Sequence, residues 1–398
     1  MQISVKINRA RVSGTVRLSQ AARELREAGR DIIDLGEGEP DFDTPDHIIA
    51  AAFDAARGGQ TRYTNVAGTT QLRQAIARHF AQRSGLRVTP EDVIVGTGAK
   101  QLIFNSMVAT LNPGDEVIIP APHWVSYPEM VAIADGTPVI VPCTSKNGFK
   151  LTPQDLVDHI TAKTRWLILN SPGNPTGAVY SSSELMALAV ILRANENVAV
   201  LSDDIYQEII FNNINFATIA AVAPDLAARC LTVTGVSKSY AMTGWRIGFA
   251  TGPRDLIAAM TKLQGQSTTN ASSVSQAAAL AALEGPQQFL AEWIKAYRRR
   301  RDLVSTALEE AGLDFTQPEG AFYHFVGCKR LIGKITPDGN NIETDSDLSL
   351  YLLTSAGVAL VPGSEFGAPG YLRICFAKSD ADLVTACERI RAALTELA

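Results

Sequence analysis

Short apolar runs rich in valine and isoleucine recur along the chain from about residue 90, with longer segments between them. The runs predict seven buried strands, at residues 93–95, 117–119, 139–141, 166–169, 198–201, 231–234 and 247–250. Several intervening segments predict helices, at residues 101–111, 182–195 and 254–264. Strands that alternate with helices indicate an α/β fold with a mostly parallel sheet covered on both faces. Ligands of such sheets bind at the carboxyl ends of the strands.

The pattern changes after residue 286, where one long helix is predicted over residues 286–311 and ends at Gly312. Three later runs predict strands of a smaller sheet, at residues 322–326, 358–361 and 372–376, and a helix from about residue 379 follows them. We therefore predict a large domain of residues 46–290. A small α+β domain would be formed by both chain ends, residues 1–45 and 291–398.

Composition narrows the class of protein. The 398 residues are 46% hydrophobic and 19% charged, as in an ordinary globular enzyme, and the net charge of −5 favours neither nucleic acid nor an anionic membrane as a partner. The five cysteines form no C-x-x-C pair or metal-ligand spacing, which predicts a reducing cytoplasm and no metal site. The first twenty residues lack the apolar run of a signal peptide, and no stretch reaches the roughly 18 apolar residues of a membrane helix.

The first candidate for chemistry is Lys238, in the segment from Thr234 to Gly248. An apolar strand leads into Ser237 and Lys238, and Arg246 follows eight residues after the lysine. A lysine that is desolvated at a strand end can lose its proton, and the neutral amine can form an imine with a carbonyl group. A single loop lysine is usually solvated, so this assignment depends on the neighbouring motifs.

Two further motifs follow predicted strands. Asp203 and Asp204 end a strand that should be buried, and Tyr206 lies close behind. A buried carboxylate requires a partner, and a protonated pyridine nitrogen is suitable; a helix N-cap followed by a core tyrosine is the alternative. Two prolines and two glycines in residues 170–177 predict a rigid loop in which Asn174 can donate to an anionic oxygen, or a plain turn.

The segment from Val95 to Gln101 opens a helix, and its backbone N–H groups suit a phosphate. Gln101 stands where a dinucleotide-binding motif requires its third glycine, which argues against a nicotinamide cofactor. Lys100 opposes the helix dipole in the first turn, a conflict that a bound anion would remove. The alternative is a lysine that simply extends into solvent.

Two other side chains stand out. Trp124 follows a predicted strand and can stack on a flat ring, although a lone tryptophan is more often part of the core. Arg373 lies inside the apolar strand of residues 372–376, where it needs a bidentate partner. A ligand carboxylate and an internal salt bridge are equally good candidates for that partner.

Taken together, these segments resemble the class I aminotransferases, which are fold-type I enzymes dependent on pyridoxal 5'-phosphate (PLP). Six segments occur in the family's order, and the resemblance extends from Gly36 to the final helix. It is strongest to the bacterial aspartate aminotransferase branch that also contains prephenate aminotransferases. It implies a large domain with a mostly parallel sheet between helices, plus a smaller α+β domain.

The resemblance also implies roles for the residues that would hold the cofactor ring. Lys238 matches the catalytic lysine that attaches PLP as a Schiff base and moves the substrate proton. Asp203 matches the acid that keeps the pyridine nitrogen protonated. Tyr206 and Asn174 match the residues that hold the ring hydroxyl, and Trp124 matches the stacking aromatic residue.

The phosphate of PLP would be bound by a cradle of Gly98, Ala99, Ser237 and Arg246, which match the family's phosphate-binding positions. Tyr63 matches a tyrosine that reaches the phosphate in the neighbouring subunit. The resemblance therefore implies a homodimer with shared active sites.

For the substrate, the resemblance implies that Arg373 binds the α-carboxylate and that the backbone of Gly38 contacts the substrate opposite it. Lys100 matches the lysine that binds the distal carboxylate of aspartate or glutamate. Trp124 and Asn174 would border the substrate as well as the cofactor.

Three positions bear on the substrate. Residues 266–270 contain no arginine, so recognition of a dicarboxylate would depend on Lys100. His123 stands where close relatives often carry an aromatic residue, and Arg11 stands near the place of a lysine in prephenate-using relatives.

The expected function is the transfer of an amino group between an amino acid, with aspartate or glutamate favoured, and a 2-oxo acid. A prephenate or aromatic aminotransferase, or a β-lyase on the same fold, is the alternative. A non-catalytic PLP-binding regulator is disfavoured because the chain shows no basic DNA-binding extension.

Overall fold

The computed structural model describes residues 1–11 and 14–398, with the side chains of residues 15–17 also outside the description. Its helices are α1 Gly14–Glu27, α2 Asp46–Arg57, α3 Thr70–Arg83, α4 Ala99–Thr110, α5 Ser126–Ile133, α6 Pro153–His159, α7 Ser182–Arg193, α8 Ile219–Val222, α9 Arg254–Gly265, α10 Ser273–Glu284, α11 Gln288–Glu310, α12 Asp345–Tyr351 and α13 Asp380–Thr395. The three interior helices predicted from the sequence correspond to α4, α7 and α9, and the long predicted helix is α11. The final predicted helix is α13, whereas α1, α2, α3, α5, α6, α8, α10 and α12 were not predicted.

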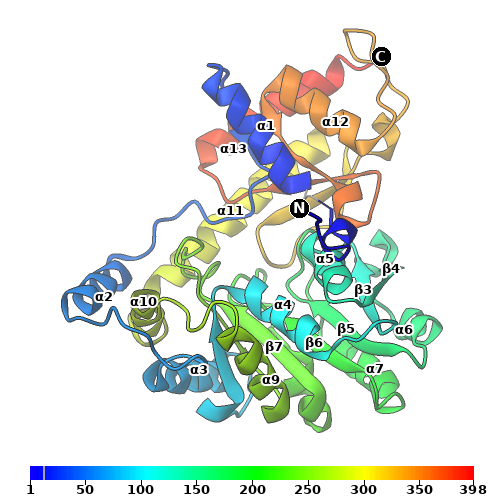
Figure 1. The fold of residues 1–398 in the computed structure, drawn as a ribbon. Coiled ribbons are helices and arrows are strands. Elements are labelled where there is room, and N and C mark those ends of the chain that lie inside the picture. The colour runs from blue at the N-terminus through cyan, green and yellow to red at the C-terminus, as the bar shows by residue number, and fades with distance from the viewer. Residues whose placement is uncertain (12–13) are drawn as a thin grey trace.

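The central sheet has seven strands in the order β2-β8-β7-β6-β5-β3-β4 (Figure 1). These strands are β2 Val93–Gly96, β3 Glu116–Ala121, β4 Thr137–Pro142, β5 Thr164–Asn170, β6 Ala199–Asp203, β7 Cys230–Gly235 and β8 Gly248–Thr251. All seven predicted strands are therefore confirmed. Only β8 runs antiparallel to its neighbours, so the carboxyl ends of the other six strands meet at one edge.

Helices cover both faces of this sheet. One hydrophobic cluster joins α4, α5 and α9 to one face, through residues such as Ile103, Val131 and Met260. A second cluster covers the other face with residues of α2, α3, α7 and α10, including Ile76 and Leu188. Burial on both faces explains why the strands read as continuous apolar runs rather than as alternating patterns.

The C-terminal part forms a smaller sheet in the order β12-β13-β10-β9, packed with α11, α12 and α13 (Figure 1). Its strands are β9 Asp314–Phe315, β10 Tyr323–Gly327, β12 Val361–Pro362 and β13 Tyr371–Cys375. The single strand predicted at residues 358–361 is wrong. β11 (Val358–Ala359) pairs in parallel with β1 (Ile33–Asp34), whereas β12 pairs antiparallel with β13. The apolar run at residues 358–361 is therefore divided between two sheets.

The first described residues lie against α5 and the turn that follows it, where Arg9 Nη1 is 2.8 Å from Asp135 Oδ1 and Lys6 also pairs with that aspartate. The boundaries predicted for the two domains, near residues 45 and 290, stay a prediction. Within residues 1–11 and 14–398, no helix is long and apolar enough to cross a membrane.

Candidate active site

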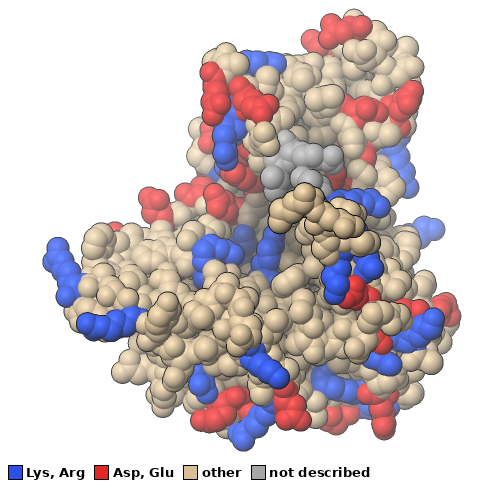
Figure 2. Space-filling view, viewed as in Figure 1, with Lys and Arg blue, Asp and Glu red and all other residues tan. Residues whose placement is uncertain are grey.

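A cavity of about 830 Å³ lies between the carboxyl ends of the central strands, β13 and helix α1. Figure 2 shows the molecule hollowed between its two parts, with Lys and Arg side chains gathered beside the hollow. Because the cavity adjoins the aligned ends of five strands, β2, β3, β5, β6 and β7, residues far apart in sequence meet there. The sequence-predicted site residues that line it are Gly38, Ala99, Lys100, Trp124, Asn174, Asp203, Tyr206, Ser237, Lys238, Arg246 and Arg373.

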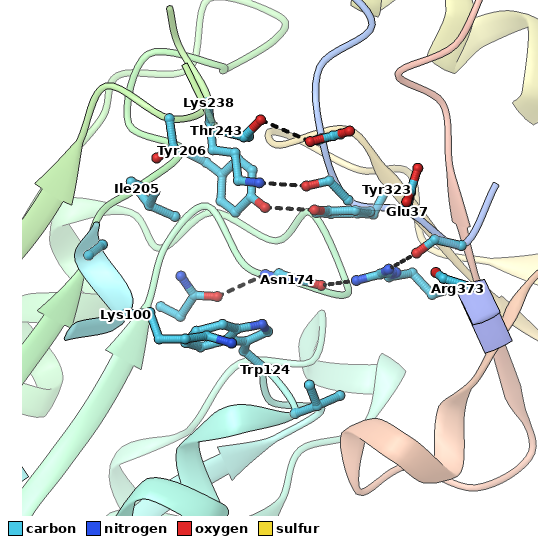
Figure 3. A pocket seen from close by; sticks show the side chains of 18 of the residues that line it. Glu37, Lys100, Trp124, Asn174, Ile205, Tyr206, Lys238, Thr243, Tyr323 and Arg373 are labelled. Carbon is cyan, nitrogen blue, oxygen red and sulfur yellow. Dashed lines mark hydrogen bonds between the residues drawn. The ribbon is translucent and has the colours of Figure 1, made fainter. Parts of the chain in front are cut away.

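Lys238 follows β7 and extends its amine into the cavity (Figure 3). The Nζ donates a hydrogen bond to the backbone oxygen of Gly38. Burial lowers the pKa of Lys238 from 10.5 to about 8, so an appreciable part of this amine is neutral near pH 8. A neutral, accessible amine is the form that attacks a carbonyl carbon.

The two adjacent acids at the end of β6 have different surroundings. Asp203 lines the cavity, and its Oδ2 accepts a hydrogen bond of 2.6 Å from the Tyr127 hydroxyl. Asp204 accepts from Ser202 Oγ at 2.7 Å and does not line the cavity. Burial raises the pKa of Asp203 to about 6, so its carboxylate is mainly ionised at neutral pH and can hold a cationic group in the cavity.

Tyr206 and Tyr323 share a hydrogen bond of 2.6 Å between their hydroxyl groups, beside the Lys238 amine (Figure 3). Tyr206 follows β6, whereas Tyr323 comes from β10 of the smaller sheet. Burial raises the pKa of both hydroxyl groups, which therefore remain protonated donors. Tyr323 was not predicted as a site residue, because nothing local distinguishes it from a core tyrosine of an apolar strand.

Arg373 is 3% exposed and forms no salt bridge with any acid in the part of the chain that the structure describes. Its Nη1 donates to Asn174 Oδ1 at 2.9 Å and its Nη2 donates to the oxygen of Gly36, while its Nε has no partner among the described residues. Asn170 accepts from the Asn174 backbone N–H at 2.8 Å and donates to the Asp203 backbone oxygen at 2.9 Å. The internal salt bridge considered from the sequence is thus absent, and a buried cation faces the cavity.

A second cationic region lies at the start of α4. Gly98 has a φ of +83°, and a Cβ at this position would lie 2.4 Å from Arg246 Nη2, so only glycine allows this close approach. Arg246 itself has a φ of +57° and donates from Nη1 to the Thr243 oxygen at 2.7 Å. Together with the N–H groups at the start of α4 and with Ser237, this region suits a phosphate.

Lys100 and Trp124 lie together in the cavity (Figure 3). The Lys100 Nζ is 4.8 Å from the centroid of the Trp124 ring, a distance at which the cation is attracted to the ring face. Burial, and then the charge of Arg246, lowers the pKa of Lys100. The lysine lines the cavity and is also exposed to solvent.

Two predicted site residues do not line the cavity. Gly98 lies behind Ala99 against Arg246, and Tyr63 is 90% exposed. Arg11 is exposed and its backbone N–H donates to Glu129 Oε2 at 2.7 Å. Other residues border the cavity without having been predicted: Tyr127, Tyr323 and, on α1, Ser19, Gln20, Arg23, Glu24 and Glu27. No local signal marks them, because they reach the cavity only through tertiary packing.

Comparison with known proteins gives this geometry its context. The family described as aminotransferase class I and II matches residues 30–390. The aspartate/prephenate aminotransferase of Cereibacter sphaeroides is 51% identical over 391 residues, covering 98% of each chain. The aspartate aminotransferase of Rhizobium meliloti is 48% identical over 397 residues, covering 100% of this chain and 97% of that protein.

Solved structures agree with this relationship. The crystal structure of the Rhizobium meliloti aspartate aminotransferase superposes with a TM-score of 0.97 at 48% identity, with 100% of both chains covered. The Thermus thermophilus aspartate aminotransferase with maleate has a TM-score of 0.92 at 41% identity, covering 99% of this chain and 100% of that one.

The chain belongs to the class I and II aminotransferase family and is a PLP-dependent aminotransferase by that membership. The predicted fold class, PLP-dependent transferase fold type I, is confirmed. Among residues 1–11 and 14–398, no group of histidine, cysteine, aspartate and glutamate side chains is arranged to hold a metal ion.

Proposed function

We propose that this enzyme transfers the amino group of a dicarboxylic amino acid, aspartate or glutamate, to a 2-oxo acid, with Lys238 as its catalytic residue. One observation carries the proposal. The amine of Lys238, with its pKa lowered to about 8, shares one cavity with a buried acid, Asp203, and with two separate cations, Arg373 and Lys100.

The cavity contains the groups that PLP requires. Asp203 is buried, with a raised pKa, and its carboxylate faces the cavity with no cationic partner bonded to it among the described residues, as a site for a pyridinium N–H needs. The close approach of Gly98 and Arg246 leaves N–H and guanidinium donors beside Ser237 for a phosphate. These features support PLP as the cofactor of this site.

When bound, PLP supplies the electron-withdrawing ring that makes the substrate α-proton acidic. Lys238 would hold the cofactor covalently and, once released by the substrate, accept the proton from the α-carbon and return it. Asp203 would keep the ring nitrogen protonated. Tyr206 and Asn174 would donate to the ring hydroxyl, and Trp124 would pack against the ring face.

The phosphate would be held by Gly98, Ala99, Ser237 and Arg246, with Tyr63 of a second copy completing the cradle. The high exposure of Tyr63 in the single chain is consistent with a role outside its own cavity. We therefore infer a homodimer with shared sites.

Arg373 would clamp the substrate α-carboxylate, with the backbone of Gly38 opposite, since its Nε lacks a partner and its fork of donors matches a carboxylate. Lys100 would bind the distal carboxylate from the other end of the cavity, beside Trp124. The Thermus relative was solved with maleate, a compound with two carboxylates, which supports this arrangement.

A second candidate substrate is prephenate, because the Cereibacter relative carries prephenate in its name. Arg11 stands near the place where prephenate-using relatives often carry a lysine, and its side chain does not line the cavity. Aspartate or glutamate is therefore the favoured substrate. A reducing cytoplasm remains the expected compartment, and all five cysteines are free.

Reduction with borohydride tests the site, because it fixes the cofactor to the amine that holds it. The purified protein should be yellow, and peptide mapping after reduction should place the pyridoxyl group on Lys238. A label on any other lysine would refute the assignment. A panel of amino donors and 2-oxo acids then tests the reaction: keto-acid products support transamination, whereas a released β-substituent would indicate a lyase.

A further inference from the structure

Tyr127 is a buried residue that no step of the reaction above uses. It lies in α5, three residues after Trp124, is 2% exposed and borders the cavity. Its hydroxyl donates to Asp203 Oδ2 at 2.6 Å, while the backbone N–H of Ile205 approaches the other oxygen, Oδ1, at 3.3 Å. The short bond from Tyr127 is the stronger of the two contacts that orient this carboxylate.

The ring of Tyr127 has a second contact. It meets the Trp124 ring edge-on, with centroids 5.3 Å apart and an interplanar angle of 82°. The same helix is anchored in the core by Met130 and Val131. One rigid residue therefore touches both the acid proposed to bind the cofactor nitrogen and the aromatic ring proposed to stack on the cofactor.

The hydroxyl is a permanent donor. Burial, followed by the charge of Asp203, raises the pKa of Tyr127 well above its usual value, so the hydroxyl stays protonated. Burial opposes ionisation of Asp203, and a hydrogen bond donated to the carboxylate favours the ionised form. Donation from Tyr127 thus helps a buried acid to remain a carboxylate.

We propose that Tyr127 is a positioning residue that acts through Asp203, aiming its carboxylate at the cofactor's pyridine nitrogen and keeping the ring proton on that nitrogen. This inference depends on the proposed function, since it assumes PLP in this cavity. The alternative is that Tyr127 only fills the core between α5 and the sheet.

The variant Tyr127→Phe separates these possibilities, because it keeps the ring and its contact with Trp124 and removes only the hydroxyl. The probe is PLP labelled with ¹⁵N in the ring, added to apoenzyme. At pH 7.5 the ¹⁵N signal of wild type should be that of a protonated pyridine, and in Tyr127→Phe it should move toward the unprotonated position. The dissociation constant of the apoenzyme for PLP should rise roughly tenfold, the loss expected for one hydrogen bond to a charged group.

A matched control is Tyr351→Phe, which removes another buried hydroxyl, one that donates to the Ala393 oxygen at 2.9 Å in the smaller domain. It should leave both the ¹⁵N signal and PLP affinity unchanged. In the Asp203→Ala background, Tyr127→Phe should add little further loss of affinity, because the two residues would act as one unit. A full additional loss would show that the Tyr127 hydroxyl acts independently of Asp203 and would overturn the proposal.

The outcomes for this inference and for the proposed function are distinguishable. If wild type binds no PLP at Lys238, the proposed function fails. If wild type binds PLP and Tyr127→Phe gives the wild-type ¹⁵N signal and affinity, only the positioning role fails. Tyr127→Met, which also lacks the hydroxyl, serves as the second variant, and if neither variant folds, Tyr127 is structural and the inference is wrong.

Discussion

The two sides of the cavity are built differently. The inner wall lies at the ends of the central strands and consists of Asn174, Asp203, Tyr206 and Lys238. Each of these residues has a hydrogen-bond partner, through its backbone N–H for Asn174 and through its side chain for the other three. The outer wall is the face of α1 that carries Gln20, Arg23, Glu24 and Glu27. Those four residues are exposed, and the side-chain bond from Gln20 to Glu24 stays within the helix.

This difference indicates where the chemistry resides. Buried polar groups with fixed partners are oriented before a substrate arrives, so they can stabilise charge that develops during the reaction. Exposed charges on a helix are screened by water and salt, so each contributes little. Substitutions in the inner wall should therefore cost far more than substitutions in the outer wall.

The largest effect is expected from Asp203→Ala in the inner wall. Loss of the carboxylate removes the partner of the ring nitrogen and should slow α-proton removal roughly a thousandfold, as for other oriented electrostatic groups. Single-turnover absorbance kinetics with saturating PLP, using protiated and α-deuterated aspartate, would measure this step. Asp204→Asn is the control, since Asp204 does not line the cavity, and near-normal rates in Asp203→Ala would exclude the proposed role.

Arg373→Ala should lower kcat/KM roughly a hundredfold for every amino acid tested, because it removes a bidentate contact with the α-carboxylate that all substrates share. Steady-state kinetics with aspartate, alanine and phenylalanine would measure the loss. A decrease confined to aspartate would mean that Arg373 does not bind the α-carboxylate.

Lys100→Ala should lower kcat/KM for aspartate by roughly ten- to a hundredfold, since one charge-assisted contact to the distal carboxylate is lost. Alanine and phenylalanine lack that carboxylate and should be much less affected. The assay needs saturating cofactor because Lys100 adjoins the phosphate cradle. Equal losses for aspartate and phenylalanine would favour a prephenate or aromatic substrate instead.

The free energy of unfolding should depend on pH through His79, a buried residue that lies next to the inner wall. Its Nε2 is 2.8 Å from Gln207 Nε2, next to Tyr206, and burial lowers the pKa of His79 from 6.5 to about 4. As pH falls below 6.5 the unfolded chain takes up a proton before the folded one does, so stability is lost between pH 6.5 and 4.

Two buried acids, Asp203 and Asp204, have raised pKa values, so they add stability as the pH falls between 6.5 and 4. Substitution of His79 separates its contribution from theirs. At pH 5, His79 should account for about 2 kcal/mol of lost stability relative to pH 7. Urea unfolding of His79→Gln should therefore depend less on pH than wild type. An unchanged pH dependence in His79→Gln would rule out this contribution.

The smallest effect is expected in the outer wall. Glu24→Gln removes an exposed charge and should change kcat/KM for aspartate by less than about twofold at physiological salt. The same steady-state assay measures it. A loss as large as that of Lys100→Ala would remove the distinction between the two walls.

The local pattern of apolar and polar residues was enough to predict the strands of the central sheet and to place much of the inner wall at their ends. Strands buried on both faces read as apolar runs, and the residues directly after strands β5, β6 and β7 had to meet at one sheet edge. This geometry predicts one site at that edge, and the resemblance to the class I aminotransferases then assigned Asn174, Asp203 and Lys238 to it. The turns into helices, such as the one at Gly98, likewise carry their own signal.

Tertiary structure alone decided the rest. Whether Asp203 or Asp204 faces the cavity depends on which neighbour covers each face of β6, and resemblance rather than any residue pattern had chosen Asp203. A partner of Arg373 is Asn174, 199 residues away, and α1 reaches the cavity by packing against β11 and β12. Such contacts join segments that are distant along the chain, and no local pattern of apolar and polar residues encodes them, because hydrophobic burial specifies which side chains are inside but not which polar groups meet there.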